Sequence, residues 1–140
     1  MNKLTNRQFI DRYFEIVDSK NVERFAEIDS PDLLMKVPMG TVRGIEGHQG
    51  LTRGFAAAFP NFKHTVTSFL ESDDRIACEG TFVGDHTGSM MLPNGQSIPA
   101  SNKRVEFEWS GHMRVQNGKV AELHVYFDSA SLMAQIGAIK

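Results

Sequence analysis

The sequence predicts an α+β fold in which helices pack against one face of a curved antiparallel or mixed sheet. Before residue 60, apolar residues recur at helical spacing, whereas from residue 62 to residue 128 most of them alternate with polar residues. Alternation with a period of two is typical of strands that bury one face. Helices first and strands later favour a cone-shaped sheet, closed on its apolar side by the N-terminal helices.

Two helices are expected near the N-terminus. Thr5 followed by Gln8 is a capping-box pattern that opens the first helix. Asn21 can cap a second, short helix. Ser30 to Asp32, with Pro31 at the centre, is expected to break the chain before a strand over residues 33–37. The apolar positions at helical spacing in the first helix are Ile10, Tyr13, Phe14 and Val17.

The middle of the chain predicts a third helix and then strands. The helix begins near Glu46 and ends at Pro60, which cannot continue it. Residues 62–71 and 76–84 alternate as strands, with a turn at residues 72–74. A long loop over 86–102 follows. Near the end, Asp128 and Ser129 predict the cap of a terminal helix that Gly137 ends.

Two alternating strands around Asn117-Gly118 predict a hairpin. A two-residue turn would set Gln116 opposite Lys119 and mix apolar and polar residues on one face. The alternation therefore favours a three-residue loop with Gly118 in the left-handed conformation. The expected cross-strand pairs are Val115 with Lys119, His112 with Glu122, Gly111 with Leu123, Trp109 with Val125, and Phe107 with Phe127.

Composition indicates a soluble globular protein of one domain over residues 1–140. Apolar residues make up 41% of the chain and charged residues 23%. The net charge of −2 favours neither nucleic acid nor an anionic membrane as a partner. No signal peptide or membrane span is expected. The single cysteine, Cys78, excludes an internal disulfide, and we expect a buried, inert thiol in a cytoplasmic protein.

Short motifs in a fixed order carry a resemblance to a known family. They are the segments 44–47 (GIEG), 58–61 (AFPN), 80–88 (GTFVGDHTG) and 117–120 (NGKV), followed by Asp128 and the ending around residues 132–137. With them the chain resembles the SnoaL-like polyketide (ester) cyclase family of the nuclear-transport-factor-2-like superfamily. The resemblance implies a cone-shaped α+β barrel, a deep hydrophobic pocket and, frequently, a dimer.

The resemblance also implies where a cyclase would keep its polar residues. Cyclases of this family use an aspartate three residues before the strand-ending aspartate as general acid/base, and that position is Val125 here. The glutamine and histidine that such cyclases place on the preceding strand correspond to Trp109 and Gly111. A valine cannot transfer a proton. The usual acid/base of a cyclase is therefore expected to be replaced by Val125.

Two residues remain candidates for catalysis. His86 stands where a strand meets the long loop, near the expected mouth of a pocket. Asp128 is a carboxylate, but its position favours a helix cap on the polar face of the sheet. His112 and His124 share that outer face with acidic residues, where solvent or a subunit interface is expected rather than a metal. No metal and no cofactor are expected.

Trp109, the only tryptophan, lies on the apolar strand face beside Gly111, which leaves space in the sheet interior. This pattern favours a pocket for a small hydrophobic or aromatic molecule. The expected lining residues are Tyr13, Met35, Val37, Phe55, Phe82, His86, Trp109, Gly111, Met113, Leu123, Val125 and Phe127.

Three functions stay open on the sequence alone. The first is a binding protein with a hydrophobic pocket. The second is a cofactor-independent cyclase, isomerase or hydratase whose acid/base has moved, with His86 favoured. The third is a non-catalytic interaction module with a filled core. A homodimer through the outer sheet face is expected, with neither nucleic acid nor membrane as partner.

Overall fold

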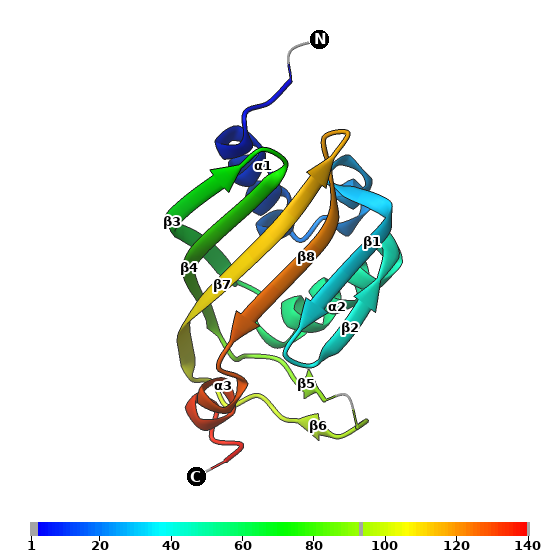
Figure 1. Cartoon of the computed structure of the whole chain (residues 1–140). Helices are drawn as coiled ribbons and strands as arrows, with labels where there is room; N and C mark the ends of the chain where they lie inside the picture. The colour runs from blue at the N-terminus through cyan, green and yellow to red at the C-terminus, as the bar shows by residue number, and fades with distance from the viewer. Residues whose placement is uncertain (1–2, 93, 140) are drawn as a thin grey trace.

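The computed structural model describes residues 3–92 and 94–139. Its main sheet has six strands in the order β2-β1-β8-β7-β4-β3 (Figure 1). Neighbouring strands are antiparallel except β1 and β8, which are parallel. This mixed, curved sheet confirms the expected α+β class. The strands are β1 (Asp29–Val37), β2 (Gly40–Arg43), β3 (Lys63–Ser72), β4 (Arg75–Asp85), β7 (Arg104–Gln116) and β8 (Lys119–Phe127).

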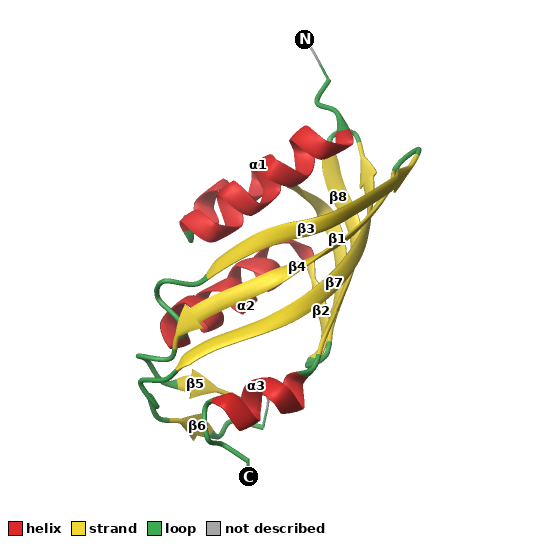
Figure 2. Ribbon diagram, turned by 90° about the vertical axis from the view of Figure 1, so that its left-hand side faces the viewer, coloured by secondary structure: helices red, strands yellow, loops and turns green. Residues whose placement is uncertain are grey.

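The helices α1 (Asn6–Ser19) and α2 (Gly44–Ala58) lie on one face of this sheet, as Figure 2 shows. The segment expected as a second helix is the 3₁₀ helix η1 (Val22–Glu27). A third α-helix, α3 (Ser129–Gln135), lies at the end of the sheet near the C-terminus (Figure 2). Among the described residues, none of the helices combines the length and the apolar composition needed to cross a membrane.

The capping box of α1 is confirmed. The Thr5 hydroxyl accepts a hydrogen bond from the backbone N–H of Gln8 at 3.1 Å, and the Gln8 side chain accepts one from the backbone N–H of Thr5 at 2.9 Å. Both bonds satisfy N–H groups that a helix start leaves free. The helix buries one face against the sheet, which fixes Tyr13 and Val17 on the inner side.

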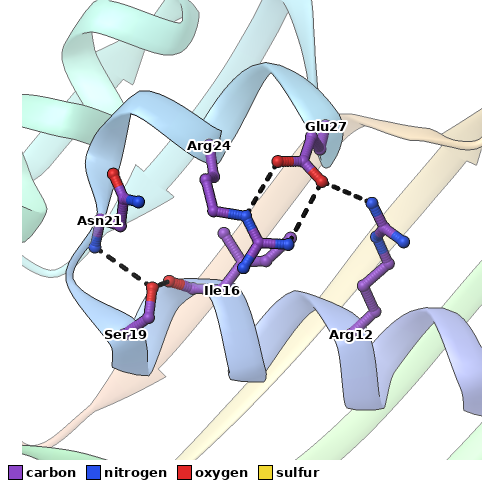
Figure 3. Close-up of polar contacts among 6 residues, drawn as sticks. All are labelled: Arg12, Ile16, Ser19, Asn21, Arg24 and Glu27. Atoms are coloured by element: carbon purple, nitrogen blue, oxygen red, sulfur yellow. Dashed lines mark hydrogen bonds and ion pairs between the residues drawn. The ribbon is translucent and has the colours of Figure 1, made fainter.

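Glu27, at the end of η1, joins η1 to α1 (Figure 3). Its carboxylate accepts from Arg24 at 2.9 Å and from Arg12 of α1 at 2.6 Å. At the turn between the two helices, the Ser19 hydroxyl donates to the carbonyl of Ile16 and accepts from the N–H of Asn21. The network ends just before Asp29, the first residue of β1.

The expected break at Pro31 is wrong, because β1 already begins at Asp29. The irregularity lies inside the strand instead. Asp29 pairs with Val120 of β8 and Leu34 pairs with Glu122, so the intervening residues of β1 bulge out of register. Proline has no N–H to donate, and a bulge is one of the places where a sheet tolerates it.

The expected register of the hairpin is also wrong. Gln116 pairs with Lys119, so the turn has the two residues Asn117 and Gly118, both at positive φ. The register then shifts after Val115, which pairs with Val120. This irregularity restores the common apolar face that a two-residue turn alone would have lost. The observed pairs are Trp109 with Phe127, Gly111 with Val125, His112 with His124, Met113 with Leu123, and Arg114 with Glu122.

The segment expected as a long loop contains two short paired strands, β5 (Met90–Met91) and β6 (Ser97–Ile98). The loop returns to the main body through backbone hydrogen bonds of His86 with Lys103 and Asn102. Another bond joins the Gly88 N–H to the carbonyl of Ala58 at the end of α2. The segment is therefore tied to the main body of the fold at both ends.

Candidate functional site

An apolar cavity of about 110 Å³ lies between the inner face of the sheet and the helices α1 and α2. All the residues expected to line a pocket border it, with the exception of His86. Other residues of α1, α2 and the inner face of the strands also line the cavity. The lining residues that the sequence did not indicate are Phe14, Val17, Met39, His48, Leu51, Thr52, Phe62, His64, Cys78 and Phe107.

Alternation along three neighbouring strands builds the sheet side of the cavity. Phe82 of β4, Phe107 of β7 and Phe127 of β8 form a stacked row, with ring centroids 4.7 Å and 4.8 Å apart. Gly111 lies opposite Val125 in the same wall. Because Gly111 has no side chain, the wall is recessed there.

Trp109 contributes a large buried ring to the same wall. Its side chain packs against Phe14 of α1, with ring centroids 5.2 Å apart, and meets the His64 ring edge-on. The indole N–H has no hydrogen-bond partner in the described chain. A buried tryptophan usually finds such a partner.

His48, which lines the cavity, belongs to a histidine–aspartate pair that the sequence did not indicate. His48 of α2 and Asp29 of β1 are both buried, at 3% and 0% exposure. Nδ1 of His48 lies 2.5 Å from Oδ2 of Asp29. The other carboxylate oxygen of Asp29 has no hydrogen-bond partner in the described chain. His48 is therefore the side chain that stabilises this buried acid.

The His48 ring is fixed by aromatic neighbours. The Tyr13 ring stacks on it at a centroid distance of 6.1 Å and an interplanar angle of 11°. The buried Phe25 ring packs against it at 4.5 Å. Burial first, and then the nearby Asp29 and Cys78, raise the pKa of the Tyr13 hydroxyl well above its ordinary value. Tyr13 therefore stays neutral and keeps its proton for donation.

Helical spacing explains why His48 points inward. His48, Leu51, Thr52 and Phe55 fall at i, i+3, i+4 and i+7 along α2, and all four line the cavity. The same periodicity was visible in the sequence and would have placed His48 on the buried face. Asp29 carried no such signal, because it precedes the irregular part of β1.

A second histidine on the cavity wall, His64 of β3, pairs with Asp18 near the end of α1. Nδ1 of His64 lies 2.6 Å from one carboxylate oxygen, and the other oxygen accepts the backbone N–H of His64 at 3.0 Å. Both side chains are 18% exposed. Because Asp18 holds the backbone as well as the ring, this pair anchors β3 to α1.

Cys78 lies on the cavity wall and is buried, as expected. Burial raises the pKa of its thiol to about 11. The thiol is therefore protonated near neutral pH, which makes it a poor nucleophile.

The structure corrects the position expected for His86. Its side chain is fully buried and does not border the cavity. Nδ1 accepts the backbone N–H of Ser101 at 3.1 Å and contacts the Ser101 hydroxyl at 2.8 Å. Burial lowers the pKa of the imidazole. His86 holds the ends of the 86–102 segment together.

Asp128 is a helix cap, as expected. Its carboxylate accepts the backbone N–H of Ser131 at 3.0 Å. On the outer face, the rings of His112 and His124 lie 4.9 Å apart, and Nε2 of His124 lies 2.8 Å from Glu122. Within residues 3–92 and 94–139, no group of three or more His, Cys, Asp or Glu side chains is arranged to hold a metal ion.

Solved structures share this fold over nearly the whole chain. IdmH of Streptomyces antibioticus, a proposed polyketide cyclase, is 24% identical, with a TM-score of 0.79 over 94% of this chain and 97% of its own. TsrD of Streptomyces laurentii is 21% identical, with a TM-score of 0.80 over 98% and 100%. A Catenulispora acidiphila protein with a ketosteroid isomerase-like fold, solved with trimethylamine, is 17% identical, with a TM-score of 0.77 over 95% of both chains.

The sequence comparisons give the family. No curated protein matches the chain. The model of the SnoaL-like polyketide cyclase family matches residues 7–136, almost the full length. The match agrees with the resemblance carried by the sequence motifs and with the shared fold. The chain belongs to the SnoaL-like polyketide cyclase family.

Proposed function

We propose that this protein binds a small hydrophobic or aromatic molecule in its apolar cavity. The observation that carries the proposal is the cavity wall itself, which is aromatic and aliphatic apart from a few polar groups. Small-molecule sites have this composition, with a minority of polar groups that orient the ligand. Here those groups are His48, His64, Tyr13 and Thr52.

The size of the cavity limits the ligand. Its volume is about 110 Å³, and an engineered apolar cavity of about 150 Å³ binds benzene. Val37, Met39, Val125 and Phe127 line the cavity and are only partly buried, so this side reaches the surface. We propose a ligand with one ring enclosed and any further ring extending past these side chains.

Fluorescence of Trp109 tests the proposal directly, because it is the only tryptophan and lies on the wall. Nitrobenzene, a quencher of this size, should quench it saturably. Val125→Phe fills the cavity and should weaken the quenching. Val83→Phe makes the same change on the outer side of β4 and should leave it unchanged. Quenching that is unsaturable, or equal in both variants, would exclude a binding cavity.

An enzyme of the cyclase or isomerase type is the second candidate function. The position that carries the acid/base in cyclases of the family is proposed to be Val125, which has no proton to exchange. The observation that favours an enzyme is the buried His48–Asp29 pair, whose histidine lines the cavity. A non-catalytic interaction module becomes the better account if no molecule enters the cavity.

We also propose a homodimer through the outer sheet face and a cytoplasmic location. Leu70 of β3 and Tyr126 of β8 are 71% and 56% exposed. Large exposed apolar side chains mark contact surfaces when they gather on one face. Light scattering should give twice the chain mass of 15.6 kDa, and Tyr126→Glu should shift it toward the monomer. A monomer at high micromolar concentration would contradict the dimer.

A further inference from the structure

We infer that His48, oriented by Asp29, is a catalytic general base for a small C–H acid bound in the cavity. The inference rests on the proposed function, because a base on the cavity wall acts only on a molecule that occupies the cavity. It differs from the expectation at His86, whose ring lies outside the cavity wall.

The position of the shared proton follows from burial. Asp29 is fully buried, and a buried carboxylate without a partner is strongly unfavourable. Its side-chain partner is Nδ1 of His48, at 2.5 Å. An ionised carboxylate can only accept hydrogen bonds, so in this contact the proton lies on Nδ1. In the tautomer with its proton on Nδ1, the ring keeps a free electron pair on Nε2.

Nε2 of His48 is the ring nitrogen that can accept a proton. In the described chain no hydrogen bond reaches it, and the ring borders the cavity. A buried histidine–carboxylate pair is weak evidence for a stabilising role, since apolar side chains of similar volume often stabilise a core better. A histidine that is held at one nitrogen by a carboxylate and that borders a cavity is an arrangement suited to general-base catalysis.

The surroundings hold this geometry before any ligand arrives. The ring contacts Tyr13 and Phe25, and Phe25 is fully buried. A side chain fixed by packing and by a hydrogen bond loses little entropy when it reacts. Tyr13 also borders the cavity, and it keeps its proton. Its hydroxyl can donate to an oxygen on which negative charge develops.

The substrate class that fits is a small apolar carbonyl compound with an acidic C–H bond. Nε2 takes the proton, and the electron pair of the C–H bond moves into the carbonyl group to form an enolate, which Tyr13 stabilises. His48 can return the proton to a different carbon, which is an isomerisation. Alternatively, the enolate carbon attacks a second carbonyl of the same molecule, and the resulting alkoxide takes the proton. Neither route needs an oxidant or a reductant.

A reporter reaction tests the base without a known substrate. When a base removes the ring C–H proton of 5-nitrobenzisoxazole, the electron pair forms a nitrile and the N–O bond breaks. The product is a coloured phenolate. At pH 8 the protein should accelerate this reaction above an equal concentration of imidazole. His48→Gln keeps a donor for Asp29 but removes the base, and it should lower kcat/KM by about 10²-fold. His112→Gln, on the outer face, is the control and should keep the wild-type rate.

Two further measurements separate catalysis from folding. Added 4-methylimidazole should restore activity to His48→Ala, in which the missing ring leaves space, and should not accelerate the His48→Gln variant. Asp29→Asn tests the positioning role, since an amide can donate to Nδ1. In that variant the ¹⁵N shifts should show the proton moving to Nε2, and the rate should fall.

The outcomes distinguish the two proposals. If nitrobenzene quenches Trp109 equally in wild type and His48→Gln but the reporter reaction is equally fast in both, the general-base inference is wrong and the binding cavity stands. If nitrobenzene does not bind the wild type, both proposals are wrong. If Asp29→Asn leaves both the tautomer and the rate unchanged, Asp29 does not orient His48.

Discussion

The indole of Trp109 lies directly over Gly80 of the neighbouring strand. A Cβ atom built on Gly80 would come within 2.6 Å of Cζ2 of the indole and within 2.0 Å of the carbonyl oxygen of Thr65. Gly80 also pairs with Trp109 in the β4–β7 register. The absence of a side chain at residue 80 therefore sets the position of the ring that we propose as the reporter of ligand binding.

Gly80→Ala should destabilise the protein and disturb the cavity wall. Overpacking of a tight site costs about 1–3 kcal/mol. Gly54→Ala is the matched control, since its Cβ would meet nothing within 4 Å. Alanine in a helix interior is more favourable than glycine by about 0.5–1 kcal/mol. Urea unfolding should therefore move the two midpoints in opposite directions, and a neutral Gly80→Ala would contradict the packing described.

Asp128→Ala should weaken α3 without affecting the cavity. Removal of an N-cap costs about 1 kcal/mol. Asp128→Asn, which keeps an acceptor for the Ser131 N–H, should recover most of this loss. The quenching of Trp109 by nitrobenzene and the reporter rate should be the same in all three proteins. Lower activity in Asp128→Asn at full stability would return Asp128 to the list of catalytic candidates.

His86 should make the folded state sensitive to acid. Its pKa is lowered by burial, so the folded protein binds this proton less readily than the unfolded chain. Stability should therefore fall as the pH drops below about 6.5, the ordinary value for histidine, until the lowered pKa is passed. Protonation would also remove the acceptor for the Ser101 N–H. We expect His86→Gln to reduce the difference between the urea midpoints at pH 7.5 and pH 5.5. If the difference stays the same, groups other than His86 cause the acid sensitivity.

Cys78 should react slowly with alkylating reagents in the folded protein. Its thiol is buried and has a pKa of about 11, so about one molecule in 10³ carries the thiolate at pH 8. Unfolding in urea should speed the reaction by orders of magnitude. Saturating nitrobenzene should slow it further in the folded state, because Cys78 borders the cavity. Fast alkylation without denaturant would contradict the burial.

Periodicity predicted most of the strands and the face that each one buries. The alternation of β7 and β8 located the apolar side, and Trp109, Gly111 and Val125 do lie on one wall. It could not give the register, because Asn117-Gly118 does form a two-residue turn and an irregularity in β8 corrects the parity one residue later. A bulge of this kind leaves no mark in a pattern that counts only apolar and polar residues.

The polar part of the site was missed for a different reason. His48 stands in a stretch with Glu46 and Gln49, which resembles a solvated helix face. Only its spacing from Thr52 and Phe55 indicates burial. Its partner Asp29 is 19 residues away along the chain. Their contact arises from the packing of α2 against the start of β1, which no local pattern encodes.

The His48 tautomer in solution tests the central claim most directly. Long-range ¹H–¹⁵N spectra at pH 8 distinguish a protonated from an unprotonated ring nitrogen. We predict a proton on Nδ1, a free electron pair on Nε2, and a change in the Nε2 shift when nitrobenzene fills the cavity, with no such change at His112. A proton on Nε2, or an Nε2 shift that nitrobenzene leaves unmoved while it quenches Trp109, would contradict a base that faces the bound molecule.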